Sequence, residues 1–255
     1  MLSTRCKLSV NINKYALLRN SRGEAAPDLL RAVDVCVAAG AHGITVHPRR
    51  DQRHIRFDDV PTIAAHLRKH HPGIEYNIEC EPAPHILDLV HEVGPEQCTL
   101  VPVKPGEVTS DHGWDLPRRA EELVEPIHAL NQQGIRVSLF MDADAPDACL
   151  ASAAQLGANR IELYTGPYAA AWGTPQQEAE RTRVFDIAAR AARHGLELNA
   201  GHDLDRFNLS GLRNLETLLE VSIGHAQIVR ALDVGTTQSV RELLNALGWD
   251  GLQFG

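Results

Sequence analysis

The stretch LELNAGHD at residues 196–203 is a short apolar run that ends in a polar turn, and this design recurs along the whole chain. Such runs lie at residues 8–12, 43–46, 76–78, 99–101, 137–140, 161–163, 196–198 and 221–223. The polar residues that follow them are, in chain order, Asn13, His47, Glu79, Lys104, Asp142, Thr165, His202 and His225. Because a (β/α)8 barrel builds its active site at the carboxyl ends of its strands, the pattern predicts a barrel enzyme.

Helix-like sequence separates the apolar runs. We expect helices at residues 27–39, 58–70, 82–93, 116–133, 145–156, 175–194, 212–219 and 237–247. The chain has 255 residues, close to the roughly 250 of a single barrel, and no low-complexity linker interrupts it. We therefore predict an α/β protein, a (β/α)8 TIM barrel with additional helices, formed as a single domain by residues 1–255.

Three connections on the functional side of this barrel are long enough to carry function. They lie at residues 20–26, 103–117 and 166–176. Long loops at this side of a barrel commonly bind ligands or close over them. We expect the first two to act as lids over the site.

The composition excludes several classes of protein. The formal net charge is −8, whereas nonspecific nucleic-acid binding needs a basic face. No apolar stretch approaches the roughly 20 residues that span a bilayer, and the N-terminal sequence lacks the apolar core of a signal peptide. The five cysteines are widely spaced and form no CxxC pair, which is typical of a reducing compartment. We therefore expect a cytoplasmic protein that binds neither nucleic acid nor membrane.

Two histidines and one carboxylate are the strongest catalytic candidates. His47 can serve as a general base because imidazole titrates near neutral pH. Glu79 follows the third apolar run, and an apolar surrounding there would raise its pKa and suit it to proton transfer. Glu81 competes for that role, and an ion pair is the alternative interpretation of Glu79. His202 is presented by the turn after the seventh run, where a plain surface histidine is the alternative.

The turn SIGHA at residues 222–226 predicts a phosphate site. Gly224 would let a phosphate approach the backbone, and His225 follows it. A short helix at residues 226–232 would offer its first N–H groups, as in many barrels after strand 8. A simple strand-to-helix turn is the alternative.

Positive charge is concentrated in the segment RRDQRH at residues 49–54 of this acidic protein. We expect one or two of these residues to bind an anion and the others to be solvated. Asn11 and Asn13 lie on one face of the first strand, because side chains alternate along a strand. Lys14 either binds an anion, forms a Schiff base with a carbonyl substrate, or is a surface cation.

A catalytic metal is the less favoured interpretation of the same residues. His47, Glu79, His202 and His225 could converge as metal ligands. However, no closely spaced pair of histidines has a carboxylate in register with it. We therefore predict that the active site contains no metal.

Seven segments together resemble the PdxJ family of pyridoxine 5′-phosphate synthases. They are NINKYALLRNSRG, GITVHPRRDQRHI, YNIE, LVPVKPGEVTSDHGWD, RIELYTGPYA, LNAGHDL and VSIGHA, in this order. Each is weakly specific alone, whereas seven in order over nearly the whole chain are highly specific. The resemblance implies a (β/α)8 barrel that assembles from dimers into a homo-octamer. It also implies condensation of 1-deoxy-D-xylulose 5-phosphate with 3-amino-2-oxopropyl phosphate, without metal or organic cofactor.

The resemblance also implies roles for individual residues. The acid–base trio of the family corresponds to His47, Glu79 and His202. The contacts to the amino-ketone phosphate correspond to Asn11, Arg22, Gly224 and His225, and those to the deoxyxylulose phosphate to Arg49, His54 and Thr109.

Three further substrate contacts differ from the commonest form of the family. Many members have Asp-His where this chain has Asn13-Lys14, and Gly where it has Asp203. One branch of the family has all three residues of this chain together: Asn and Lys at positions 13 and 14, and Asp at position 203. The resemblance therefore keeps Asn13, Lys14 and Asp203 as substrate-binding residues.

Two other functions are compatible with the residues considered alone. A different phosphosugar barrel enzyme, such as a lyase or an epimerase, could use Lys14 or Lys104 as a Schiff-base lysine. A non-catalytic sensor of a phosphorylated ligand would bind at the same place without turnover. In each case the ligand is a small phosphorylated molecule.

Overall fold

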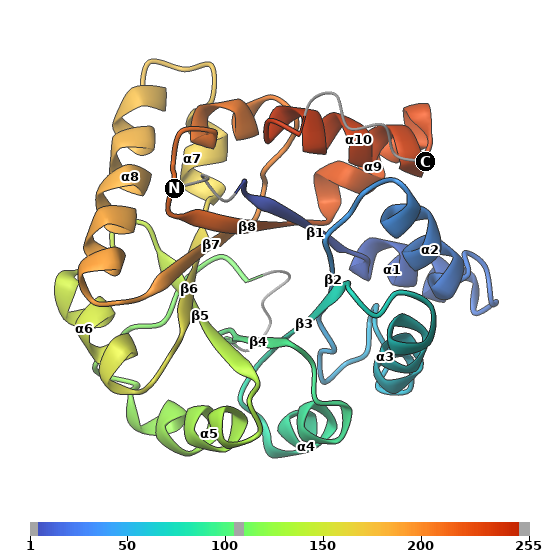
Figure 1. The fold of residues 1–255 in the computed structure, drawn as a ribbon, viewed down its shortest axis with the longest axis horizontal. Coiled ribbons are helices and arrows are strands. Elements are labelled where there is room, and N and C mark those ends of the chain that lie inside the picture. The colour runs from blue at the N-terminus through green and yellow to red at the C-terminus, as the bar shows by residue number, and fades with distance from the viewer. Residues whose placement is uncertain (1–4, 105–109, 250–255) are drawn as a thin grey trace.

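The computed structural model describes residues 5–104 and 110–249, and its strands close into one parallel barrel (Figure 1). Each strand pairs with its neighbours in the sequence, and β8 pairs with β1 to close the ring. The strands are β1 (Lys7–Asn11), β2 (Gly43–Val46), β3 (Glu75–Cys80), β4 (Gln97–Leu100), β5 (Arg136–Asp142), β6 (Arg160–Tyr164), β7 (Glu197–Gly201) and β8 (Leu218–Ile223). The predicted (β/α)8 barrel is confirmed.

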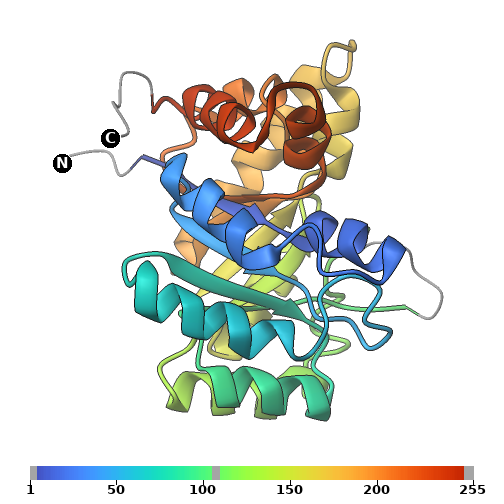
Figure 2. The ribbon, with the colours of Figure 1, turned by 90° about the vertical axis from the view of Figure 1, so that its right-hand side faces the viewer.

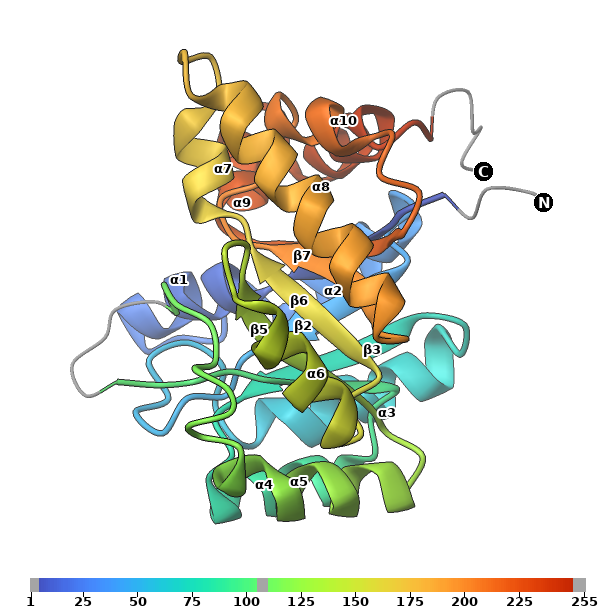
Figure 3. The same cartoon turned by 90° about the vertical axis from the view of Figure 1, so that its left-hand side faces the viewer.

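Helices form the outer wall of this barrel (Figures 2 and 3). They are α1 (Asn13–Arg22), α2 (Leu29–Ala38), α3 (Asp59–His70), α4 (Pro84–Val93), α5 (Glu121–Gln132), α6 (Asp147–Gln155), α7 (Gly166–Ala171), α8 (Gln177–Arg193), α9 (His225–Val234) and α10 (Thr236–Ala246), with a 3-10 helix η1 (Asn208–Leu212). Two helices follow each of β1, β6 and β8, which gives the additional helices that were expected. Within the described residues, no helix is both long enough and apolar enough to cross a bilayer.

The structure corrects the expected elements at three places. Helix α1 occupies the start of the first connection, so only residues 23–26 of the proposed 20–26 loop lie outside a helix. Helix α7 occupies the first half of the connection at 166–176. The helix expected at 212–219 is wrong, because Leu212 ends η1 and Leu218 begins β8. The leucines spaced three apart there are buried in the core from an irregular segment rather than from one helical face.

Polar and apolar residues alternate along the strands, and the polar ones fill the barrel. Ser9 Oγ lies 2.7 Å from Thr45 Oγ1, Asn77 Nδ2 donates to Thr45 Oγ1 at 3.4 Å, and Thr99 Oγ1 donates to Asn77 Oδ1 at 3.2 Å. The intervening apolar residues are fully buried and belong to the main hydrophobic core; examples are Leu8, Ile44, Ile78 and Leu100. Most barrels of this class fill their interior with branched aliphatic residues, so this polar interior is unusual.

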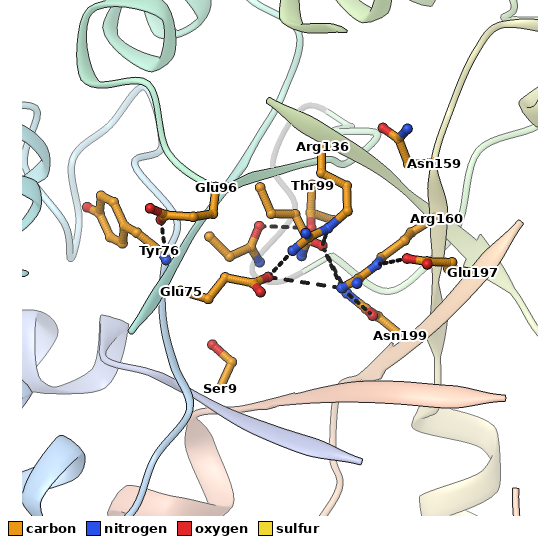
Figure 4. A network of polar contacts seen from close by, with 12 residues as sticks. Ser9, Glu75, Tyr76, Glu96, Thr99, Arg136, Asn159, Arg160, Glu197 and Asn199 are labelled. Atoms are coloured by element: carbon orange, nitrogen blue, oxygen red, sulfur yellow. Dashed lines mark hydrogen bonds and ion pairs between the residues drawn. The ribbon is translucent and has the colours of Figure 1, made fainter. Parts of the chain in front are cut away.

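A network of ion pairs lies at the amino end of the barrel (Figure 4). Arg136 pairs with Glu75, and its Nε donates to Gln97 at 3.0 Å. Arg160 Nε donates to Glu197 at 2.7 Å, and its Nη1 donates to Gln97 at 3.2 Å. Two guanidinium groups therefore share one amide oxygen and have carboxylates beside them, which satisfies charges that would be costly to bury alone.

Candidate active site

A cavity of about 420 Å³ opens at the carboxyl ends of the strands. Eleven of the thirteen residues proposed from the sequence as catalytic or substrate-binding line it, together with Glu162, Ser222 and others. They are Asn11, Asn13, Lys14, His47, Arg49, His54, Glu79, His202, Asp203, Gly224 and His225. The sequence pattern thus predicted where these side chains would meet.

Glu79 joins three strands within this cavity. Its Oε2 lies 3.5 Å from His47 Nδ1 and accepts a hydrogen bond from Asn11 Nδ2 at 3.4 Å. Its Oε1 accepts a hydrogen bond from Ser222 Oγ at 3.4 Å. The side chains of His47 and Glu79 are 8% and 14% exposed, so both reach the cavity while the barrel shields them from bulk water. An imidazole and a carboxylate at this distance can exchange a proton through a small movement or through a substrate atom.

His47 is oriented by the start of α1. The backbone N–H of His47 donates to Asn13 Oδ1 at 2.9 Å, and the backbone N–H of Asn13 donates to Asn11 Oδ1 at 3.0 Å. The two asparagines therefore link the end of β1 to the end of β2. Because Asn13 uses its carbonyl oxygen in this way, its amide nitrogen is the group that can face a ligand.

Glu162 is a site residue that the sequence reasoning missed. Its carboxyl group lines the cavity below Glu79 and accepts a hydrogen bond from Thr99 Oγ1 at 3.3 Å. Burial, followed by the charges of Glu79 and Glu220, raises the pKa of Glu162 well above its usual range. Gly201 makes room for it, since a Cβ at that position would collide with the Glu162 carboxyl group. Glu162 is therefore a buried acid that holds its proton more tightly than an ordinary carboxyl group, beside a second carboxylate.

The turn after β7 holds His202 in an unusual backbone conformation. The φ angles of His202 and Asp203 are +81° and +58°, in the left-handed region that non-glycine residues rarely adopt. The His202 ring packs edge-on against Tyr164, with ring centroids 5.3 Å apart, and its Nδ1 lies 3.5 Å from Asp203 Oδ2. Such strain is often found at functional sites, where the surrounding structure enforces it.

One wall of the cavity is cationic. Lys14, Arg49, Arg53 and His54 line it, and Arg49 is buried. Arg53 also pairs with Asp51, whose Oδ2 accepts from its Nε at 2.7 Å. Arg49 is therefore the cation of the 49–54 segment that the fold directs most firmly toward a ligand. Three residues of this segment, Arg49, Arg53 and His54, line the cavity, and the binding of an anion by one or two of them stays a prediction.

His54 can serve as a neutral hydrogen-bond donor in this wall. Burial, with the nearby charges of His47 and Arg49, lowers the pKa of His54 to about 3. The backbone N–H of Ile55 donates to His54 Nδ1 at 2.9 Å, so the ring proton is on Nε2. Nε2 is then available to donate to an anionic oxygen.

Helix α1 anchors the loop that carries these groups. Arg19 forms a bidentate ion pair with Asp59, at 2.6 and 2.8 Å. Asn20 Nδ2 donates to the backbone oxygen of His54 at 2.7 Å. The last turn of α1 is thus tied to the 49–54 loop, which argues against the expectation that Asn20 belongs to a free lid.

Helix α9 points its first turn into the cavity. Gly224 precedes the helix and His225 begins it, one residue before the expected start at residue 226. A Cβ at Gly224 would lie 3.0 Å from the backbone oxygen of Asn11, so a side chain would be crowded there. Free N–H groups at a helix start, next to a glycine, form an anion-binding position.

Two of the proposed substrate contacts are not seen in the cavity. The Arg22 side chain is 79% exposed and lies 3.7 Å from Glu24, so α1 does not direct it to the pocket. Thr109 lies outside the described residues, as does part of the 103–117 lid.

Glu81, the competitor of Glu79, pairs with Arg50 at 2.8 Å. The described remainder of the lid packs on β5, where Trp114 N–H donates to the Phe140 oxygen at 2.9 Å.

A closed parallel barrel with acid–base groups at the carboxyl ends of its strands defines the class of (β/α)8-barrel enzymes. A family profile described as "Pyridoxal phosphate biosynthesis protein PdxJ" matches residues 8–248. The chain belongs to this PdxJ family and is an enzyme of vitamin B6 biosynthesis.

Similar proteins support the same assignment. A pyridoxine 5′-phosphate synthase of Xanthomonas axonopodis pv. citri is 51% identical over 249 residues, which cover 94% of this chain and 96% of that protein. One of Albidiferax ferrireducens is 48% identical over 247 residues, covering 94% and 97%. The solved tryptophan synthase alpha chain of Legionella pneumophila has a TM-score of 0.65 at 13% identity, covering 97% and 93% of the two chains. That likeness shows the fold alone.

Proposed function

We propose that this protein is a pyridoxine 5′-phosphate synthase that condenses 3-amino-2-oxopropyl phosphate with 1-deoxy-D-xylulose 5-phosphate. The products are pyridoxine 5′-phosphate, inorganic phosphate and water. Membership of the PdxJ family and the names of relatives at about 50% identity support this reaction. No metal or organic cofactor takes part in the proposed chemistry.

The observation that carries the mechanism is the contact between His47 and Glu79 in the cavity. The amine of one substrate attacks the ketone of the other and forms an imine with loss of water. Proton removal with loss of a second water, loss of phosphate and ring closure follow, and each step moves a proton. In this proposal Glu79 alternates as acid and base, His47 assists proton abstraction, and His202 protonates a leaving oxygen.

The two phosphates are assigned to two parts of the cavity. The start of α9, with Gly224 and His225, receives the amino-ketone phosphate, and Asn11 lies beside it. Arg49 and His54 receive the deoxyxylulose phosphate from the cationic wall. The same proposal keeps Thr109 as a further phosphate contact, and Asn13, Lys14 and Asp203 as contacts to the sugar phosphate. Arg22, which is exposed beside Glu24, would contact a phosphate only after its side chain has moved. A buried cation and a neutral donor suit a phosphate better than a second solvated arginine, because little side-chain freedom is lost on binding.

Product formation by the purified, chelator-treated protein tests this function. Both substrates are generated freshly, and chromatography detects pyridoxine 5′-phosphate. Product without added metal is the expected result. Folded protein that binds a phosphorylated ligand but makes no product would contradict the proposal. A borohydride-trapped adduct at Lys14 would instead indicate an aldolase-type reaction.

We also propose that the protein acts in the cytoplasm as a homo-oligomer, with an octamer as the expected size. The five free cysteines are compatible with a reducing compartment. Large apolar side chains are exposed on the adjoining helices α1 and α9, with Leu18 at 51% and Leu232 at 76% exposure. Exposed apolar residues on adjoining helices are compatible with a subunit interface. Light scattering on the purified protein measures the assembly, and a monomer would contradict this inference.

A further inference from the structure

A histidine-rich turn lies on the outer wall of the barrel, away from the active cavity. Helix α3 ends in the run HLRKHH at residues 66–71, and α2 packs beside it (Figure 1). Both helices end just before the strands that follow them, so their last turns lie at the amino end of the barrel. The cavity lies at the other end, and the proposed reaction does not use these histidines.

Asp34 of α2 holds two of the histidines. His66 Nε2 and His71 Nε2 lie 2.6 and 2.7 Å from the same carboxylate oxygen, Oδ1. The three donor atoms all lie within 4.8 Å of one another. In the part of the chain that the structure describes, this is the one group of three His, Cys, Asp or Glu side chains that converges so closely.

The way the rings converge also suits a metal ion. Two ring N–H groups could each donate a hydrogen bond to a different oxygen of the carboxylate, since a carboxylate has two oxygens. Here both nitrogens point to one oxygen, so a single cation placed among the three atoms would contact all of them after small side-chain shifts. Two imidazoles with one carboxylate form a ligand set that zinc uses in proteins.

The surroundings allow an ion to enter and do not repel it strongly. The side chains of His66, His71 and Asp34 are 16%, 21% and 48% exposed, so the rings are fixed while the carboxylate faces solvent. The carbonyl end of α3 carries a partial negative charge that favours a cation. Arg68, the nearest guanidinium in the run, donates to the backbone oxygen of Val93 at the end of α4 and is held there.

We infer that Asp34, His66 and His71 form a divalent-metal site that clips α2 to α3. Imidazole ligands select Zn²⁺, and related ions such as Co²⁺, over Mg²⁺ and Ca²⁺. Three protein ligands leave one tetrahedral position for water. Because the two helices hold the ligands together only in the folded chain, the ion stabilises the folded state by mass action. It acts on stability and not on the chemistry of the cavity.

Metal titration of the full chain tests this site. Chelator-treated, desalted protein is titrated with Zn²⁺ by calorimetry, and with Co²⁺ by visible absorption, which reports the ligand geometry. The variants His66→Gln and His71→Gln each remove one ligand. The exposed neighbour His70→Gln is the matched control, because it lies in the same run but outside the cluster. Comparing variants within one protein accounts for any ion held by the histidines of the cavity.

The expected result has three parts. The wild type and His70→Gln bind one more Zn²⁺ than His66→Gln and His71→Gln, or bind it at least about tenfold more tightly, the lower limit for changes even in the second shell of a metal site. Zn²⁺ raises the melting temperature of the first pair and not of the second. The Co²⁺ absorption band is present in the first pair only. Equal Zn²⁺ binding by all four proteins, or saturation of the wild type only at millimolar Zn²⁺, would overturn the inference.

Discussion

The two ends of this barrel contain similar side chains in opposite conditions. At the amino end, Arg160 Nε meets Glu197 at 2.7 Å and Arg136 pairs with Glu75 (Figure 4). At the carboxyl end, the polar contacts of Glu79 are 3.4 to 3.5 Å long and face an open cavity. Charges at the amino end are neutralised by one another, whereas those at the carboxyl end are arranged for a ligand. The same eight strands therefore contribute to stability at their amino ends and to catalysis at their carboxyl ends.

The largest effect is expected from Glu79→Gln at the carboxyl end. The amide keeps the shape and can accept from Asn11 while its NH2 group donates to Ser222 Oγ, but it cannot transfer a proton, so turnover should fall by about 10²- to 10⁴-fold. Substrate binding should be largely retained. Steady-state kinetics and a binding titration measure the two quantities. Glu81→Gln is the matched control, because Glu81 pairs with Arg50 outside the cavity, and near-normal turnover of Glu79→Gln would disprove its role.

The next effect is expected from Arg160→Met at the amino end. This change leaves the buried amide oxygen of Gln97 and the half-exposed carboxylate of Glu197 without this partner, so the unfolding free energy should fall by about 1–3 kcal/mol. Urea unfolding measures the loss. The turnover of the folded fraction should be unchanged at a low temperature, because the cavity is intact. A large fall in kcat with normal stability would show that the two ends are not separate in function.

Glu220 should make stability depend on pH. It is buried at the amino end, and burial together with the charge of Glu75 raises its pKa to about 7. Its protonated form is therefore favoured by folding, so this contribution is complete below about pH 4.5 and is lost as the pH rises through about 7. The loss is at most about 3 kcal/mol. Urea unfolding across this range should show a flatter profile for Glu220→Gln than for the wild type, and identical profiles would contradict the assignment.

The smallest effect is expected at Asp203. Its φ of +58° lies in a region that is unfavourable for every residue except glycine. Asp203→Gly should therefore stabilise the fold by up to about 1 kcal/mol. Thermal unfolding would then shift upward by about 2 °C. A downward shift would mean that the Asp203 side chain, which lies 3.5 Å from His202 Nδ1, contributes more than the backbone strain costs.

Much of the fold and the site could be predicted because strand ends carry a strong signal. An apolar run followed by a polar residue marks the carboxyl end of a strand, and His47, Glu79 and His202 were found in this way. Glu162 escaped because it lies inside a strand, between two apolar residues. Side chains alternate between the inside and the outside of the barrel along a strand, and this alternation places Glu162 in the cavity. A pattern that marks only the polar residues after the strands does not find it.

Other features depend on contacts between distant segments. The helix expected at 212–219 failed because pairing of Leu218 with Leu198 competes with local helical spacing. The histidines at 66 and 71 receive their carboxylate from another helix, because α2 supplies Asp34 from more than 30 residues earlier. No local pattern reports such a partner.

The two-residue alternation of the strands also limits how this sequence can vary in evolution. An insertion of one residue within a strand would exchange its two faces, placing polar groups against the helices and aliphatic groups inside the barrel. Substitutions at single positions change one contact, whereas such an insertion changes every contact beyond it. Length variation among descendants of this sequence should therefore be confined to the loops, and libraries built for its improvement should keep each strand at constant length.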